Sequence, residues 1–417
     1  MKPVKISDGV FSLRVNRHSG RRLAPLVAAA AGAGCNAYLV KGSAKTALID
    51  SVEGEHADVL FDYLRGEKPD YIVSSNSEQD HSGAIPLLLA RYPRAKVVTN
   101  RKGKELLMAH LRVPAGKFTE AGDGESLPLG GRALEFIYTP WAHWPETMST
   151  YLRGPKCLFS GNLFGSCLCT DQLISDTRSI YEPMKRYFSQ VLMPHRASIK
   201  THLQRFAGYE TDLIAPGHGP VHSDAGFVMA AYREWVFGEP HNKTLVAYVS
   251  THGSTYMLVN RLANRLQEAG VCVDKINLDH PDDGSLAMSL MDATSIVLGT
   301  PTVLAGPHPK VIYGAYLANL LRPKAKFVSV VGSFGWGGRT LETISGLIPN
   351  LKAKLLKPVM VKGLPEEADL VQIDELAALI AQKHSGLPAA VCNVPRPIRA
   401  AYRGTVFAIP DIGGQYT

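Results

Sequence analysis

The strongest constraint on the fold is a regular alternation of strands and helices in the carboxyl-terminal part of the chain. Apolar strand-like runs are separated by segments with the 3.6-residue periodicity of amphipathic helices. Strands connected through helices run parallel, so we expect a doubly wound, five-stranded α/β sheet. The expected strands are 244–250, 271–277, 295–300, 326–331 and 355–361, and the expected helices are 255–269, 283–291, 309–321, 338–347 and 371–384.

The first 240 residues alternate differently and predict a core of two sheets covered by helices. Strand-like stretches at 8–16, 36–52, 134–140 and 148–161 are interleaved with helical patterns at 54–66, 82–92 and 101–112. The turn residues Gly42 and Ser43 predict a hairpin. A polar, turn-rich link at 237–243 separates this part from the next strand. We therefore expect domains at 1–240 and 243–387, followed by an extension at 388–417 that packs on the surface or on a partner.

The composition excludes several classes of protein. A chain of 417 residues with 45% hydrophobic and 20% charged residues has the balance of a globular protein. Its apolar runs are too short for a membrane span, and its opening segment has no apolar signal-peptide core, which together predict a cytoplasmic location. The net charge of +8 is spread evenly along the chain. That distribution disfavours nucleic-acid binding and suits the docking of a small acidic protein.

A cluster of hydroxyl side chains follows the first strand of the carboxyl-terminal part. The run STHGST at 250–255 combines hydroxyls, a glycine and the start of a helix, and these features favour an anion such as phosphate. A simple capped helix explains one or two of the hydroxyls but not all of them. Two further loops, GTPT at 299–302 and GSFGWGG at 332–338, end the third and fourth strands, where doubly wound sheets bind ligands. A phosphate site beside an aromatic on a glycine-rich loop predicts flavin mononucleotide (FMN).

With these three loops in order, residues 243–385 resemble flavodoxin, a family that uses FMN as an electron carrier. The resemblance implies phosphate contacts from one loop and contacts beside the flavin ring from the other two. The implied phosphate-binding residues are Ser250, Thr251, Gly253, Ser254 and Thr255. The implied ring-side residues are Pro301, Thr302, Ser333, Phe334, Gly335, Trp336 and Gly337.

Acidic residues and histidines gather after the strands of the amino-terminal part. The run NSEQDHSG at 76–83 supplies oxygen and imidazole donors at short range, which suits a metal ion, although a helix start with solvated acids has the same composition. Three more polar segments also follow expected strands: TPWAHWPET at 139–147, FSGNLFG at 159–165 and APGHG at 215–219. In this order the segments resemble the metallo-β-lactamase superfamily, which implies an αββα sandwich.

A lactamase-like domain followed by a flavodoxin-like domain makes residues 1–385 similar to the flavodiiron proteins. The resemblance implies two irons in the first domain and FMN in the second. It also implies a rubredoxin-type electron donor, reduction of dioxygen or nitric oxide at the metal, and a head-to-tail homodimer or tetramer. No catalytic residue is expected apart from the metal ligands. The positions that match the family's ligands are Glu78, Asp80, His81, His143 and His218.

Two amides replace ligands that the family pattern requires. Asn76 stands where the family has its first histidine, and Asn162 stands where it has the aspartate that bridges the irons. An amide is a neutral, weak ligand and offsets no cationic charge. By correspondence one iron keeps Glu78 and His143, whereas the other keeps the remaining three ligands. The sequence therefore leaves open a diiron centre, a single metal ion and an empty pocket.

Two other functions follow from these alternatives. In the first, FMN still carries electrons, but the lactamase-like domain is a catalytically silent scaffold for assembly and partner docking. In the second, weaker hypothesis, the protein is a zinc hydrolase, for which a flavodoxin-like domain has no use. The flavodiiron oxidoreductase is the leading hypothesis.

Overall fold

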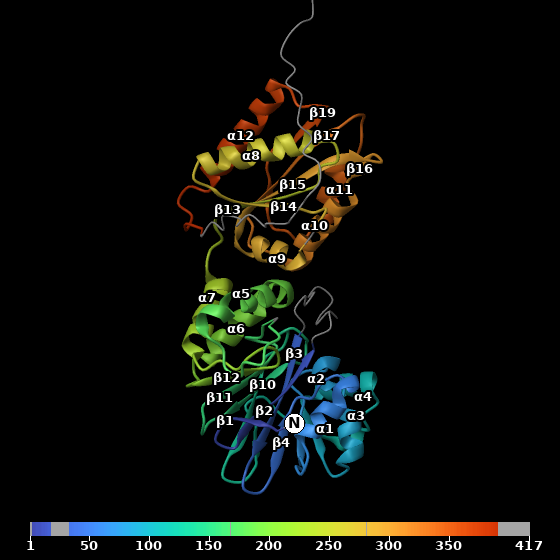
Figure 1. Cartoon of the computed structure of the whole chain (residues 1–417), viewed down its shortest axis with the longest axis vertical. Helices are drawn as coiled ribbons and strands as arrows, with labels where there is room; N and C mark the ends of the chain where they lie inside the picture. Colours follow the sequence, from blue (N-terminus) through green and yellow to red (C-terminus); the bar gives the residue numbers. More distant parts are fainter. Residues whose placement is uncertain (1, 18–32, 167, 281, 391–417) are drawn as a thin grey trace, which may run out of the picture.

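A computed structural model describes residues 2–17, 33–166, 168–280 and 282–390. Figure 1 shows two α/β units stacked along the long axis, with the amino-terminal unit below and the carboxyl-terminal unit above. In the described residues, no helix is both long and apolar enough to cross a membrane. The segments 18–32 and 391–417 lie outside the described residues. The second of these segments makes up most of the expected extension at 388–417.

The first sheet has its seven strands in chain order. They are β1 (Val4–Ser7), β2 (Val10–Arg17), β3 (Ala33–Lys41), β4 (Thr46–Ile49), β5 (Tyr71–Val73), β6 (Lys96–Thr99) and β7 (Phe118–Glu120). Strands β1 to β4 pair antiparallel and include the expected hairpin, whereas β4 to β7 pair parallel. The intervening helices are α1 (Ala57–Tyr63), α2 (Gln79–Ser82), α3 (Ile85–Arg91) and α4 (Arg101–Leu111).

The second sheet packs face to face on the first. Its order is β12-β11-β10-β9-β8, with β8 (Ser126–Pro128), β9 (Ala133–Tyr138), β10 (Met148–Leu152), β11 (Cys157–Gly161) and β12 (Leu213–Pro216). Tyr38 and Ile49 of the first sheet share one buried cluster with Phe136 and Phe159 of the second. Its helices are α5 (Thr177–Tyr187), α6 (Arg196–Phe206) and α7 (Ala225–Phe237). The unit is the expected αββα sandwich.

The carboxyl-terminal unit is a parallel, doubly wound sheet, as the sequence predicts. The strands lie in the order β14-β13-β15-β17-β18, with β13 (His241–Tyr248), β14 (Cys272–Asn277), β15 (Ala293–Val303), β17 (Phe327–Phe334) and β18 (Lys354–Leu355). A two-residue strand, β16 (Gly306–Pro307), adds antiparallel to β15. The order places the first strand between the second and third, which is the flavodoxin-like arrangement. The helices are α8 (Ser254–Glu268), α9 (Asp283–Asp292), α10 (Pro309–Leu321), α11 (Thr340–Leu347) and α12 (Glu367–Lys383).

The fifth strand of this sheet differs from the expectation because it is broken in two. β18 and β19 (Val359–Lys362) both pair with β17, but at different positions along it. Pro358 lies in the gap between them. Proline has no N–H to donate to the sheet, so the pairing stops and resumes after it.

Ion pairs connect the two units of the chain. Lys185 at the end of α5 binds Asp292 at 2.7 Å, and Arg186 binds Asp282. Figure 1 shows α5 and α9 facing each other at this junction. Burial alone would raise the pKa of Asp282, but hydrogen bonds from Arg186 and Ser285 outweigh it and lower the pKa to about 2.

We expect the Asp282 contact to stabilise the junction at neutral pH and to fail in acid. Because its folded-state pKa lies below the ordinary value of 3.8, the contribution is complete above about pH 4 and is lost as the pH falls through 2. The pair is partly exposed, so Asp282→Asn should lower the free energy of unfolding by about 1 kcal/mol or less at pH 7. Urea unfolding at pH 7, 4 and 2.5 checks this. If the free energies of unfolding of the native chain and Asp282→Asn differ by the same amount at all three pH values, this expectation is wrong.

Candidate functional site

The predicted metal ligands come together at one edge of the αββα sandwich. Asp80 and His81 lie in α2, which follows β5, and Glu78 directly precedes this helix. His143 lies between β9 and β10, Asn162 follows β11, and His218 follows β12. Each therefore extends from the carboxyl end of a strand or from a loop beside it. Segments that are far apart in the sequence thus converge on one pocket.

Three of the predicted ligands form a buried group. The Nε2 atom of His218 lies 3.3 Å from Asp80 Oδ2 and 3.1 Å from His81 Nε2. His81 Nε2 lies 3.8 Å from the same Asp80 oxygen. Donors bound to one ion at about 2.0–2.1 Å in tetrahedral geometry are separated by roughly 3.3 Å. The spacing of these three atoms therefore fits a single divalent cation.

The other two predicted ligands contact each other nearer the surface. His143 Nε2 lies 2.9 Å from Glu78 Oε2, and both side chains are about one-fifth exposed (17% and 20%). Two donors are few for a stable metal site, so this pair depends on a bridging group for any second ion.

The two asparagines do not provide that bridge. The Oδ1 atom of Asn76 accepts the backbone N–H of Glu78 at 2.9 Å, so its carbonyl is used locally. Asn162 Oδ1 accepts the Tyr187 hydroxyl at 3.2 Å and lies 2.9 Å from His81 Nε2. The Nδ2 atoms of both amides are buried without a hydrogen-bond partner in the described residues. The predicted ligands as a whole therefore suit one cation better than a pair of cations.

The electrostatics of the buried group favour a charged carboxylate beside a charged imidazole. Burial alone would raise the pKa of Asp80, but the His81 charge and the hydrogen bond from His218 outweigh it and lower that pKa. Burial alone would lower the pKa of His81, but the Asp80 charge and the contact with Asp50 outweigh it and raise that pKa to about 10. His81 Nδ1 lies 3.4 Å from Asp50 Oδ2. Both shifts favour the charged forms, so Asp80 and His81 stabilise each other as an ion pair.

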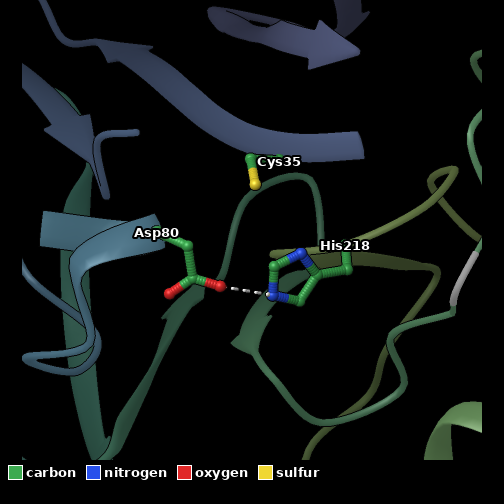
Figure 2. A group of neighbouring side chains, drawn as sticks. All are labelled: Cys35, Asp80 and His218. Carbon is green, nitrogen blue, oxygen red and sulfur yellow. Dashed lines mark ion pairs between the residues drawn. The ribbon is translucent and has the colours of Figure 1, made fainter. Parts of the chain in front are cut away.

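The structure adds neighbours that sequence reasoning missed. Cys35, in β3, lies close enough to Asp80 and His218 for one donor atom of each to be within 4.8 Å of the others. Figure 2 shows the three side chains pointing toward one another. Asp50 and Tyr187 also contact the pocket. No spacing in the sequence signals these contacts, because they depend on how distant strands and loops pack.

The predicted phosphate loop has the features of an anion site. Gly253 adopts a positive φ of 94° at the N-cap of α8 and has no side chain with which to cap the helix. A Cβ atom at Gly253 would meet nothing within 4 Å, so the backbone of this residue is not crowded by neighbours. The Ser250 hydroxyl accepts the Tyr256 N–H at 3.1 Å, and Thr255 Oγ1 lies 3.1 Å from Ser333 Oγ. The predicted phosphate and ring-side loops therefore meet, and they fit a phosphate.

The predicted ring-side loops lie at the ends of β15 and β17. Pro301 pairs with Ser333 in the sheet, and Thr302 Oγ1 lies 3.0 Å from Thr340 Oγ1. Trp336 follows β17 and is 79% exposed. Cβ atoms at Gly335 and Gly337 would also meet nothing within 4 Å. An exposed indole beside open backbone fits a planar ligand, and the assignment of these residues to FMN stays a prediction.

Comparison with known proteins places the chain in a family. A family model described as ODP family beta lactamase matches residues 33–219. The chain is 30% identical over 385 residues to the type A flavoprotein fprA of Rhodobacter capsulatus, covering 88% of each chain. It is 29% identical over 399 residues to the nitric oxide reductase of Moorella thermoacetica, covering 92% of this chain and 99% of that protein.

The solved structure of the rubredoxin oxygen:oxidoreductase from Desulfovibrio gigas has the same fold. It matches with a TM-score of 0.88 and 26% identity, covering 92% of this chain and 98% of that one. The match spans both α/β units, and the flavoprotein and reductase relatives likewise align along most of their lengths. The chain belongs to the flavodiiron family of type A flavoproteins.

Proposed function

We propose that this protein is a flavodiiron-type oxidoreductase. Electrons pass from a small redox protein through FMN to a metal site in the amino-terminal unit, which reduces dioxygen or nitric oxide. The observation that carries the proposal is the presence of both sites in one chain. A helix start with hydroxyl side chains and a glycine N-cap follows β13, and a buried group of acid and imidazole donors lies at the sandwich edge. The names of the relatives are those of reductases and flavoproteins, and they do not favour a silent scaffold.

The carboxyl-terminal unit supplies the flavin site. FMN, when bound, takes up and releases one or two electrons. The N–H groups at the start of α8 and the hydroxyls of Ser250, Ser254 and Thr255 bind its phosphate. Trp336 covers the ring and limits its contact with water, since an indole packs well against a planar aromatic system.

The amino-terminal unit supplies the metal pocket. Asp80, His81 and His218 are the donors that fit a divalent ion, and such an ion binds and polarises a small oxygen or nitrogen ligand. Glu78 and His143 form the adjacent, partly exposed pair. The reduction of either gas consumes protons, and the Tyr187 hydroxyl at Asn162 holds one at the edge of the pocket.

The partners follow from the family and from the charge of the chain. A net charge of +8 suits an acidic donor of the rubredoxin type, since opposite charge accelerates protein association. A head-to-tail homodimer or tetramer brings the flavin loops of one subunit close to the metal pocket of another. A cytoplasmic location is part of the same proposal.

Gas consumption by the full-length protein tests this function. The flavin is reduced anaerobically with NADH as the electron source, passed through a rubredoxin reductase and a rubredoxin, and dioxygen or nitric oxide is then added. We expect the native protein to consume one of the gases with reoxidation of the flavin. Asp80→Asn, which removes a donor from the pocket, should lower that rate by about 100-fold or more. A flavin that is reduced while neither gas is consumed contradicts the proposal, as does an Asp80→Asn variant of native rate.

A further inference from the structure

We propose that Cys35 is a metal ligand in this protein, and that Cys35, Asp80 and His218 together hold one divalent first-row transition ion. The family resemblance assigns no role to residue 35. The inference shares the pocket of the proposed function but does not depend on FMN or on the electron donor.

The three side chains are held on separate elements that point into one space. Cys35 comes from β3, Asp80 from α2, and His218 from the loop after β12. One donor atom of each lies within 4.8 Å of the other two, and all three residues are buried, with exposures of 1%, 5% and 2%. Figure 2 shows the sulfur, the carboxylate and the imidazole facing a common centre.

Backbone contacts fix the position of Cys35 relative to His218. The two residues form an isolated antiparallel bridge between β3 and the loop after β12. The next residue, Asn36, donates its backbone N–H to Gly217 at 2.9 Å, and its side chain donates to Pro216 and Gly219. Donor side chains that a rigid backbone already holds in place lose little conformational entropy when an ion binds.

The buried carboxylate of Asp80 is only partly satisfied by hydrogen bonds. Asp80 Oδ1 has no hydrogen-bond partner in the described residues, although the residue is only 5% exposed. A buried, charged oxygen without a partner is costly unless a cation occupies the space beside it. Figure 2 shows that Oδ1 points away from Cys35 and His218, whereas Oδ2 faces the imidazole at 3.3 Å. An ion held by the three side chains would bind Oδ2 and offset the charge of the carboxylate as a whole.

Charge balance explains why a thiol is suited to this pocket. When sulfur binds the ion, the S–H bond breaks, the S–metal bond forms and the proton leaves to solvent. The thiolate and the Asp80 carboxylate then balance the two positive charges of one divalent ion. The neutral amide of Asn162 contributes no charge. Cys35 therefore supplies a negative charge that Asn162 does not. Together with Asp80, this charge is enough to balance one divalent ion but not two.

Zinc K-edge X-ray absorption of the full-length protein tests the proposal. The protein is stripped with a chelator and reloaded with zinc ions. One sulfur at about 2.3 Å, beside nitrogen and oxygen at about 2.0–2.2 Å, is expected for the native chain. Cys35→Ser should lose the sulfur shell and weaken zinc binding by about 100-fold or more. Circular dichroism and FMN content establish that the variant is folded.

Cys157→Ser is the matched control. Cys157 is also a buried thiol, but it lies in β11 within the cluster between the two sheets. This variant should keep both the sulfur shell and the zinc affinity. A native spectrum with only nitrogen and oxygen neighbours overturns the role of Cys35 and leaves the proposed function intact. Failure of the native chain to bind any metal overturns both. A sulfur shell that persists in Cys35→Ser also rejects the proposal.

Discussion

Replacing Asn162 with aspartate, together with Asn76 with histidine, is expected to raise the iron content from at most one ion to about two ions per chain. Asn162 is fully buried, and its Oδ1 atom already faces His81 at 2.9 Å. Aspartate has nearly the same shape, so the exchange adds a bridging charge with little repacking. Histidine at 76 adds a third donor to Glu78 and His143. Two metal ions can then share one pocket and act together on the substrate.

Iron analysis after anaerobic reconstitution measures this change. Asn319→Asp is the control, because it adds the same charge at a buried amide of the carboxyl-terminal unit, where Asn319 Oδ1 accepts the Asn350 N–H. It should leave the iron content unchanged. If the double variant binds no more iron than the native chain, the pocket differs from the family in more than these two positions.

Replacing Ser254 with aspartate is expected to abolish FMN binding while leaving the fold intact. Ser254 is the first residue of α8, and a carboxylate there faces the expected phosphate. Two like charges at about 4 Å repel by up to about 4 kcal/mol near a protein surface, which predicts a loss of FMN affinity of 100-fold or more. The same carboxylate favours the helix, because it lies at the positive end of the helix dipole. The variant should therefore be stable but colourless.

Equilibrium titration of the flavin-free protein with FMN, followed by fluorescence quenching, measures the effect. Ser254→Ala removes the hydroxyl without adding charge, so it should weaken binding by about 10-fold or less. Equal FMN affinity in the aspartate variant and the native chain places the phosphate elsewhere. Urea unfolding in the absence of FMN separates loss of binding from loss of structure.

The doubly wound sheet could be predicted because its signals are local. Helix α10 occupies the expected residues, and the other helices begin or end within a few residues of expectation. β13 begins at His241, three residues earlier than expected. The polar residues before 244 match the expected link between the domains, but one of them lies inside the sheet. Lys243 is buried there in a 2.8 Å ion pair with Asp274, and no hydrophobic pattern predicts such a pair. Tertiary contacts override the local preference at this position.

The metal pocket was only partly predictable. Asp80 and His81 are neighbours in the sequence, so their grouping is a local feature, and the family pattern located His143 and His218. Cys35 lies in another strand, and its place beside His218 depends on the bridge between β3 and the loop after β12. Cys35 and His218 are distant in the sequence, so the packing of the sheets decides whether they meet. Composition and residue spacing do not reveal that packing. The use of the Asn76 carbonyl by a backbone N–H is likewise visible only in the structure.

The metal and flavin content of the native protein, purified without oxygen, shows whether one chain holds one metal ion or two. Elemental analysis for iron and zinc is combined with flavin quantification on the same sample. We expect about one FMN and no more than one metal ion per chain, because the donor groups in the described pocket that have the spacing for a divalent ion share Asp80 and His218 and can therefore hold only one ion. Two tightly bound irons per native chain would contradict it.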